Sequence, residues 1–157
     1  MNVTEQQTVD TTPGVDRLQQ WIALQSGFHR LTDRLFEEVT RRTGLPPSSI
    51  QILLLLLQSP PLHSVQMTHL ARSLEYSTAG ITKVTDRLLH AGLIERSPCM
   101  TDRRVVRATL TGPGCEVAEQ VAVILAEGLD REIVSKIGEE QFASLASVVA
   151  TLDDGLH

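Results

Sequence analysis

Residues 77–104 read STAGITKVTDRLLHAGLIERSPCMTDRR, and this stretch decides the fold. Its first half has one apolar and one polar helical face, because apolar side chains recur three and four residues apart. Gly92 ends that helix, and Leu93-Ile94 begins an extended segment. After a turn containing Asp102-Arg103-Arg104, a second extended segment follows over residues 105–110 (VVRATL). A helix followed by a hairpin with a basic tip is typical of a winged helix-turn-helix.

Apolar periodicity predicts five more helices around this unit, over residues 15–43, 46–58, 67–74, 111–137 and 139–152. Ser77 and Thr111 stand where side-chain oxygens cap helices, and a short extended piece is expected around Val65. The predicted fold class is mainly α with a small β-hairpin wing, six helices in all. We expect a flexible arm over 1–14 and a single domain over 15–157. Its winged-helix lobe spans 46–110, and further helices span 15–43 and 111–157.

The formal net charge of −5 conceals a basic segment. Residues 68–110 carry seven basic and four acidic side chains, a balance of +3, whereas residues 1–67 carry −1 and residues 111–157 carry −7. Phosphate binding requires a positive local surface and not a positive total. The longest apolar run is far too short to cross a bilayer, and the polar N-terminal residues do not resemble a signal peptide. We therefore expect a cytoplasmic protein without a membrane partner.

The two faces of the 77–90 helix have different compositions. The side expected to pack on a core carries Ile81, Val84, Thr85 and Leu88. The opposite side, which also includes Asp86, has small residues that allow close approach to a major groove. There Thr82 can donate or accept at a base edge, and Lys83 and Arg87 can reach phosphate or guanine. The predicted DNA contacts are Ser77, Thr78, Ala79, Gly80, Thr82, Lys83 and Arg87, although this pattern alone also fits an ordinary surface helix.

The hairpin tip supports the DNA interpretation. Arg103 and Arg104 are permanently charged, and Arg103 at the tip suits a narrow minor groove with negative potential. Phosphate repels Asp102, so we interpret it as the partner that fixes an arginine fork, that of Arg104. The alternative is a solvated turn with a surface ion pair.

At these residues the chain resembles the MarR family of bacterial transcriptional regulators. The matching pieces are Leu70-Ala71, residues 84–88 (VTDRL), residues 92–96 (GLIER), residues 102–104 (DRR) and Leu110-Thr111 with Gly114. Their order and spacing are more specific than any single piece. One departure concerns the start of the short helix before the turn. The family often has Thr or Ser there and this chain has Gln66, so Ser64 or Thr68 would have to serve as the cap.

The resemblance implies a homodimer in which the first and the last two helices form the dimer lobe and each winged helix reads one half-site of double-stranded DNA. It also implies a possible small-molecule effector in the crevice between the lobes. Trp21, Gln25, Phe28 and His29 lie mid-helix where such a crevice is expected, although packing at a lobe junction explains them equally well. Operator sequence, effector and the sign of regulation cannot be read from these residues.

The remaining reactive side chains give weaker signals. Cys99 should be exposed near the wing tip, where its oxidation could disturb DNA binding, whereas Cys115 suits a packed position. The five histidines have no ligand spacing, so we predict neither a metal site nor a cofactor. No catalytic motif is present, and we do not expect an enzyme. The predicted function is a DNA-binding regulator, most simply a repressor. The alternatives are a winged-helix protein-interaction module and a redox-responsive regulator using Cys99.

Overall fold

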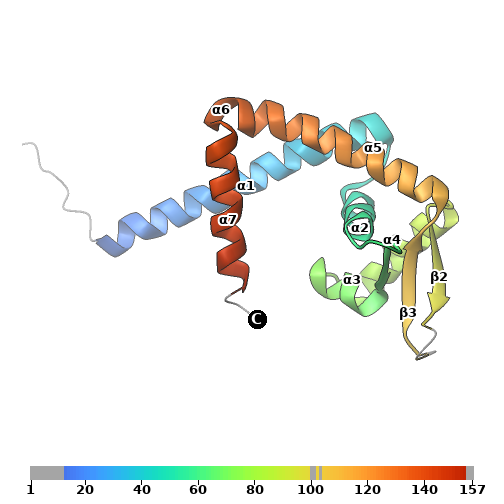
Figure 1. Ribbon diagram of the computed structural model, residues 1–157. Coiled ribbons are helices and arrows are strands. Elements are labelled where there is room, and N and C mark those ends of the chain that lie inside the picture. The colour runs from blue at the N-terminus through green and yellow to red at the C-terminus, as the bar shows by residue number, and fades with distance from the viewer. Residues whose placement is uncertain (1–12, 100–101, 103, 155–157) are drawn as a thin grey trace, which may run out of the picture. The chain divides into compact units, whose positions relative to one another are not determined.

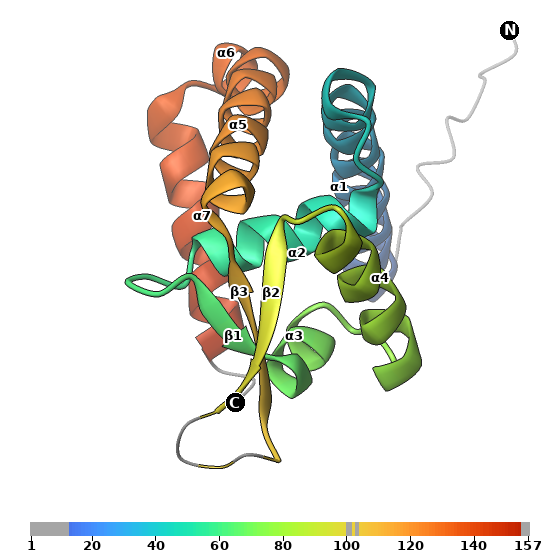
Figure 2. The same ribbon diagram turned by 90° about the vertical axis from the view of Figure 1, so that its right-hand side faces the viewer.

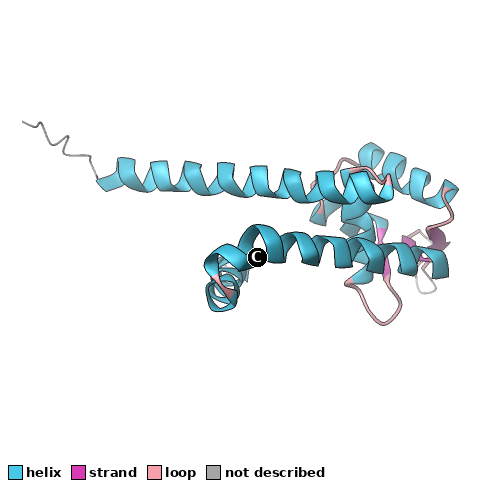
Figure 3. Cartoon of the chain, turned by 90° about the horizontal axis from the view of Figure 1, so that it is seen from above, coloured by secondary structure: helices cyan, strands magenta, loops and turns pink. Residues whose placement is uncertain are grey.

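The computed structural model describes residues 13–99, 102 and 104–154 of the 157-residue chain. It divides into two units, one up to Arg34 and one from Leu35 onward, and the boundary falls within α1 (Pro13–Thr43). The second unit continues through α2 (Pro47–Leu57), β1 (Ser64–Gln66), α3 (Met67–Ser73), α4 (Thr78–His90), β2 (Ile94–Pro98), β3 (Val106–Leu110), α5 (Gly112–Leu129), a π-helical segment (Asp130–Val134), α6 (Ser135–Ile137) and α7 (Glu139–Asp154). Helices dominate the chain, as Figure 3 shows.

These elements confirm the predicted fold class and its six helices. The helix expected over residues 111–137 is one helical run made of α5, the π-helical segment and α6. Gly44 and Gly92, which the sequence marks as helix ends, both have positive φ angles (75° and 70°) that side chains with a Cβ rarely adopt. The described helices include none that is long and apolar enough to cross a membrane.

The sheet has three strands in the order β1-β3-β2, all antiparallel (Figure 2). The hairpin of β2 and β3 is the predicted wing, with Arg96 opposite Ala108. The extended piece expected around Val65 is the third strand, because Val65 pairs with Ala108 on the other side of β3. The wing is therefore attached to the start of α3 through β1.

Two caps fix the ends of the winged-helix region. Ser77 Oγ accepts a hydrogen bond from the Gly80 N–H at 3.1 Å at the start of α4. Thr111 Oγ1 accepts from the Gly114 N–H at 3.0 Å and donates to the Gly92 carbonyl at 2.7 Å. A Cβ on Gly114 would lie 1.8 Å from the Leu93 carbonyl oxygen, so only glycine fits there. The start of α5 is thereby held against the turn that leads into the wing.

A cluster of buried apolar side chains forms the core of the winged-helix region. It includes all the apolar residues predicted for the inner face of α4, and Thr85 beside them is also buried. Its members are Ile52, Leu53, Leu56, Val65, Leu70, Ile81, Val84, Leu88, Ile94, Ala108, Leu110 and Ala118. A smaller cluster of Val39, Ile50, Val121 and Ile124 joins the end of α1 to α2 and α5. Figure 1 shows α5 passing beside α2 and leading out of the sheet.

The terminal helix α7 has no buried residue among its described side chains. Phe142 and Leu145 are half-buried, whereas Val148, Val149 and Leu152 are 56%, 51% and 64% exposed. In the first unit, the part of α1 up to Arg34 also has exposed apolar side chains, namely Val15, Leu18, Trp21, Ile22, Leu24 and Phe28. Both helices therefore carry apolar surface that a single chain leaves in water.

Candidate nucleic-acid interface

The predicted DNA contacts of α4 lie on the side of the helix away from the core. Six of them are exposed, namely Ser77, Thr78, Ala79, Thr82, Lys83 and Arg87, and Gly80 is half-buried. Ile81, Val84 and Leu88 hold the opposite side in the core. The helix is therefore packed firmly on one face, while most residues of the other face are exposed.

Hydrogen bonds within α4 refine what its small residues can do. Thr82 Oγ1 donates to the Thr78 carbonyl at 2.8 Å, so its hydroxyl retains acceptor capacity and a methyl group for a base edge. A Cβ on Gly80 would lie 3.2 Å from Ser77 Oγ and 3.4 Å from Tyr76 Cδ1. Gly80 thus permits close packing around the capped turn. Tyr76 is itself anchored, because its hydroxyl donates to Gln51 Oε1 at 3.1 Å.

Three cations in this region are available to an outside anion. Among the ion pairs of the described residues, none involves Lys83, Arg87 or Arg104. All three side chains are exposed, two on α4 and one on the wing. Cations without a carboxylate partner are the groups that neutralise DNA phosphates.

Arg96 on β2 joins the wing to α4. Its Nη1 lies 2.6 Å from Oδ1 of Asp86, and its Nη2 donates to the Thr82 carbonyl at 3.1 Å. Nη2 also donates to the hydroxyl of Thr85, which in turn donates to the Ile81 carbonyl at 2.8 Å. The side chains of Arg96 and Asp86 are 22% and 46% exposed, so this contact is partly shielded from water. One guanidinium therefore ties the strand to two successive turns of the helix.

This contact is not predicted by the sequence pattern. Helical periodicity puts Asp86 on the DNA side of α4 without a partner, and Arg96 belongs only to the family resemblance. In the structure Asp86 is half-buried and its charge is compensated by Arg96, which reduces its repulsion of nearby phosphate. The available signal for this ion pair was the presence of opposite charges, Asp86 before the Gly92 turn and Arg96 after it. Their contact depends on how β2 folds back along α4, and periodicity does not give that geometry.

The wing tip requires a correction. Asp102 Oδ1 accepts from the main-chain N–H of Arg104 at 2.9 Å, and not from its guanidinium as the sequence analysis expected. The Val105 N–H then donates to the Asp102 carbonyl at 2.9 Å, which closes the turn. A short aspartate side chain reaches the main-chain N–H two residues later more easily than it reaches the guanidinium at the end of a long arginine side chain. Arg103, the predicted minor-groove contact, lies outside the described residues.

The other candidate residues have modest roles in the structure. Cys99 is half-buried, and not exposed as expected, and its N–H donates to the Val105 carbonyl at 2.7 Å at the base of the turn. Cys115 packs against the main core, as predicted. In the described part of the chain no three His, Cys, Asp or Glu side chains are grouped as a metal site would require. Gln66 is the N-cap residue of α3 and makes no side-chain cap hydrogen bond, and Ser64 Oγ accepts instead from Arg107 and Thr109.

The comparisons with known proteins agree with this geometry. The model of the MarR family matches residues 45–106, which contain α2, α4 and most of the wing. The uncharacterized HTH-type transcriptional regulator YhbI of Bacillus subtilis is 31% identical over 110 residues, which cover 69% of this chain and 71% of YhbI.

Two solved structures show the same fold. Sco3205, a MarR family transcriptional regulator from Streptomyces coelicolor solved in complex with DNA, superposes with a TM-score of 0.77 at 24% identity, covering 91% of this chain and 89% of Sco3205. NadR in complex with 4-hydroxyphenylacetate superposes with a TM-score of 0.72 at 24% identity, covering 83% of this chain and 89% of NadR.

Proposed function

Because the chain belongs to the MarR family of transcriptional regulators, we propose that it represses transcription by occupying a pseudo-palindromic operator as a homodimer. The observation that carries this proposal is the open face of α4, where exposed cations without carboxylate partners lie beside small residues. Such a face suits the major groove, and the wing beside it suits the adjacent backbone and minor groove. Bound protein would exclude polymerase from the promoter.

The proposed contacts come from α4 and from the wing turn. Lys83 and Arg87 contact phosphate or guanine, and Thr82 accepts at a base edge, with Ser77, Thr78, Ala79 and Gly80 at the approach of the helix to the groove. Arg103 and Arg104 contact the backbone or the minor groove from the wing, and Asp102 holds the turn that presents them. The winged-helix lobe of this proposal spans residues 46–110.

The homodimer is supported by the exposed apolar side chains of α7 and of the first part of α1. In this proposal residues 15–43 and 111–157 form the dimerisation lobe, and a second copy covers that surface. A symmetric dimer places two α4 helices on half-sites about one helical turn of DNA apart, so both are bound together. In this proposal the protein acts on DNA in the cytoplasm.

An effector would act by changing the spacing of the two α4 helices, because operator binding requires both at once. NadR was solved with an aromatic carboxylate, 4-hydroxyphenylacetate. Here the candidate effector-binding residues are Trp21, Gln25, Phe28 and His29 on α1. The large apolar side chains of Trp21 and Phe28 are 55% and 42% exposed.

The test begins with a pull-down of genomic fragments by the purified protein, followed by affinity measurements on the recovered operator at several salt concentrations. We expect the logarithm of the association constant to fall steeply with the logarithm of salt concentration, and Arg87→Gln to reduce the slope by about one for a lost phosphate contact. Arg131→Gln, which removes the same charge from a position outside the winged-helix region, should leave the slope unchanged. A flat salt response in the parent protein would favour the protein-interaction module instead.

A further inference from the structure

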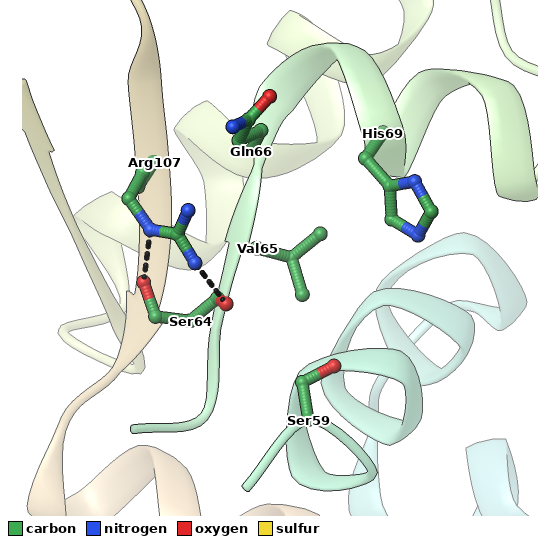
Figure 4. Close-up of a pocket in the computed structure, with 6 residues that line it drawn as sticks. All are labelled: Ser59, Ser64, Val65, Gln66, His69 and Arg107. Carbon is green, nitrogen blue, oxygen red and sulfur yellow. Dashed lines mark hydrogen bonds between the residues drawn. The ribbon is translucent and has the colours of Figure 1, made fainter. Parts of the chain in front are cut away.

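A polar hollow lies in the winged-helix region, apart from the predicted DNA contacts of α4. It has a volume of about 370 Å³ and lies where β1 leads into α3, with the end of α2 and strand β3 beside it. Its lining consists of Ser59, Ser64, Val65, Gln66, His69 and Arg107. None of these six residues carries a carboxylate. Figure 4 shows Arg107 and His69 on opposite sides of the hollow, with Val65 between them.

Arg107 is held in the hollow by neutral partners. Its Nε donates to Ser64 Oγ at 3.0 Å and its Nη2 donates to the Ser64 carbonyl at 2.6 Å, as the dashed lines in Figure 4 mark. The Thr109 hydroxyl also donates to Ser64 Oγ at 2.8 Å, which fixes that acceptor. These bonds orient the guanidinium but leave its charge uncompensated, since none of the ion pairs of the described residues includes Arg107.

The half-buried position makes that charge significant. Arg107 is partly shielded from water, where a guanidinium gains more from an anionic partner than it does on an open surface. Its hydrogen bonds within the described residues use Nε and Nη2, so the N–H groups of Nη1 remain available as donors. The His69 imidazole contacts Ser73 Oγ through Nε2 at 3.3 Å, which leaves its Nδ1 to contact an anion. The exposed Gln66 side-chain amide adds a further donor.

We propose that this hollow binds a phosphate-type oxyanion, held by the Arg107 guanidinium with His69 and Gln66 as additional donors. Two sources could supply the anion. The first is the DNA backbone, because the helix preceding the recognition helix crosses the backbone in helix-turn-helix complexes and α3 is that helix here. The second is a free phosphate or a phosphorylated small molecule. The DNA source rests on the function proposed above, whereas the free anion does not.

The first experiment titrates the isotope-labelled protein with inorganic phosphate in the absence of DNA, at constant ionic strength, and follows backbone amide and arginine Nε signals by NMR. We expect saturable shifts at Ser64, Gln66, His69 and Arg107, their loss in Arg107→Gln and their retention in Arg131→Gln. Thermal unfolding checks that Arg107→Gln is folded. If it is not, His69→Ala removes an exposed side chain and should weaken phosphate binding several-fold. Shifts that do not saturate, or that persist in folded Arg107→Gln, would overturn the proposal.

The second experiment separates the sources by measuring operator affinity in phosphate-free chloride buffer. If the DNA backbone supplies the anion, Arg107→Gln weakens binding to all operator variants alike and lowers the salt slope by about one. If a free anion is the ligand, Arg107→Gln binds like the parent, and added phosphate changes the affinity of the parent but not of the variant. The phosphate titration is independent of operator binding, so a failure of the proposed function would be seen separately.

Discussion

The winged-helix core and the terminal helices contain the same kinds of apolar residue, but the core buries them and the terminal helices leave many of them exposed. Leu53, Leu56 and Leu70 are 0% exposed inside the winged-helix region, whereas Val149 and Leu152 of α7 are 51% and 64% exposed. Burial of an aliphatic side chain is worth about 1.5–3 kcal/mol, so α7 leaves a substantial gain unrealised in the single chain. The winged-helix region completes its core alone, whereas the terminal helices leave apolar side chains exposed in the single chain.

The largest effect that tests this contrast is expected from charge on α7. The double substitution Val149→Glu, Leu152→Glu would place carboxylates in the surface that we propose a second copy covers. Operator affinity should fall by about 10²-fold or more, because two linked half-site contacts become independent. Sedimentation measures the expected loss of the dimer, and operator titration measures the loss of affinity. Ser147→Glu, which adds charge to the opposite side of α7, is the control, and a stable dimer in the double variant would contradict the assignment of α7.

The second prediction concerns the completed core. Leu56→Ala should lower the free energy of unfolding by about 2–5 kcal/mol, since it removes buried methyl groups and leaves a cavity. Urea denaturation at several protein concentrations measures this loss, which should appear at every concentration. The α7 double variant should instead remove the concentration dependence. If the loss of unfolding free energy depends on protein concentration equally in both variants, the two regions are not energetically separate.

A smaller effect is expected from the contact that attaches the wing to α4. A double-mutant cycle with Arg96→Gln and Asp86→Asn should give a coupling energy of about 0.5–3 kcal/mol for unfolding, because both groups belong to one network. Arg96→Gln alone should also weaken operator binding, as it leaves the Asp86 carboxylate uncompensated near phosphate. Lys136→Gln, which removes a cation from an exposed pair, is the control for charge. Additive effects in the cycle would show that the ion pair does not position α4.

The smallest effect is expected at the wing turn. Asp102→Ala removes the acceptor for the Arg104 N–H and should weaken operator binding by about 0.5–1.5 kcal/mol, the usual worth of one hydrogen bond. Asp102→Asn keeps a side-chain oxygen for that bond and removes the charge, so it should bind at least as well as the parent. Titrations of both variants against one operator decide the point. If Asp102→Ala also binds as well as the parent, Asp102 does not hold the turn.

Local patterns were sufficient for much of the fold. The three- and four-residue spacing of Ile81, Val84 and Leu88 identified the buried face of α4, and Ser77 identified its cap. These features depend on residues within one or two helical turns, where the backbone geometry is already known. The basic segment and the order of its motifs likewise indicated the family.

Tertiary structure decided which distant side chains meet. Arg96 could be placed on β2 from its sequence position, but its contact with Asp86 depends on the path of the chain around Gly92. By its sequence position Arg107 is one more residue of the wing, and only the pairing of β1 with β3 brings Ser64 within hydrogen-bond distance of its guanidinium. The sequence by itself determined the helices, the caps at Ser77 and Thr111, and the α4 surface, because those depend on residues close together in the chain. The ion pair, the third strand and the polar hollow depend on long-range packing, which only the folded chain specifies.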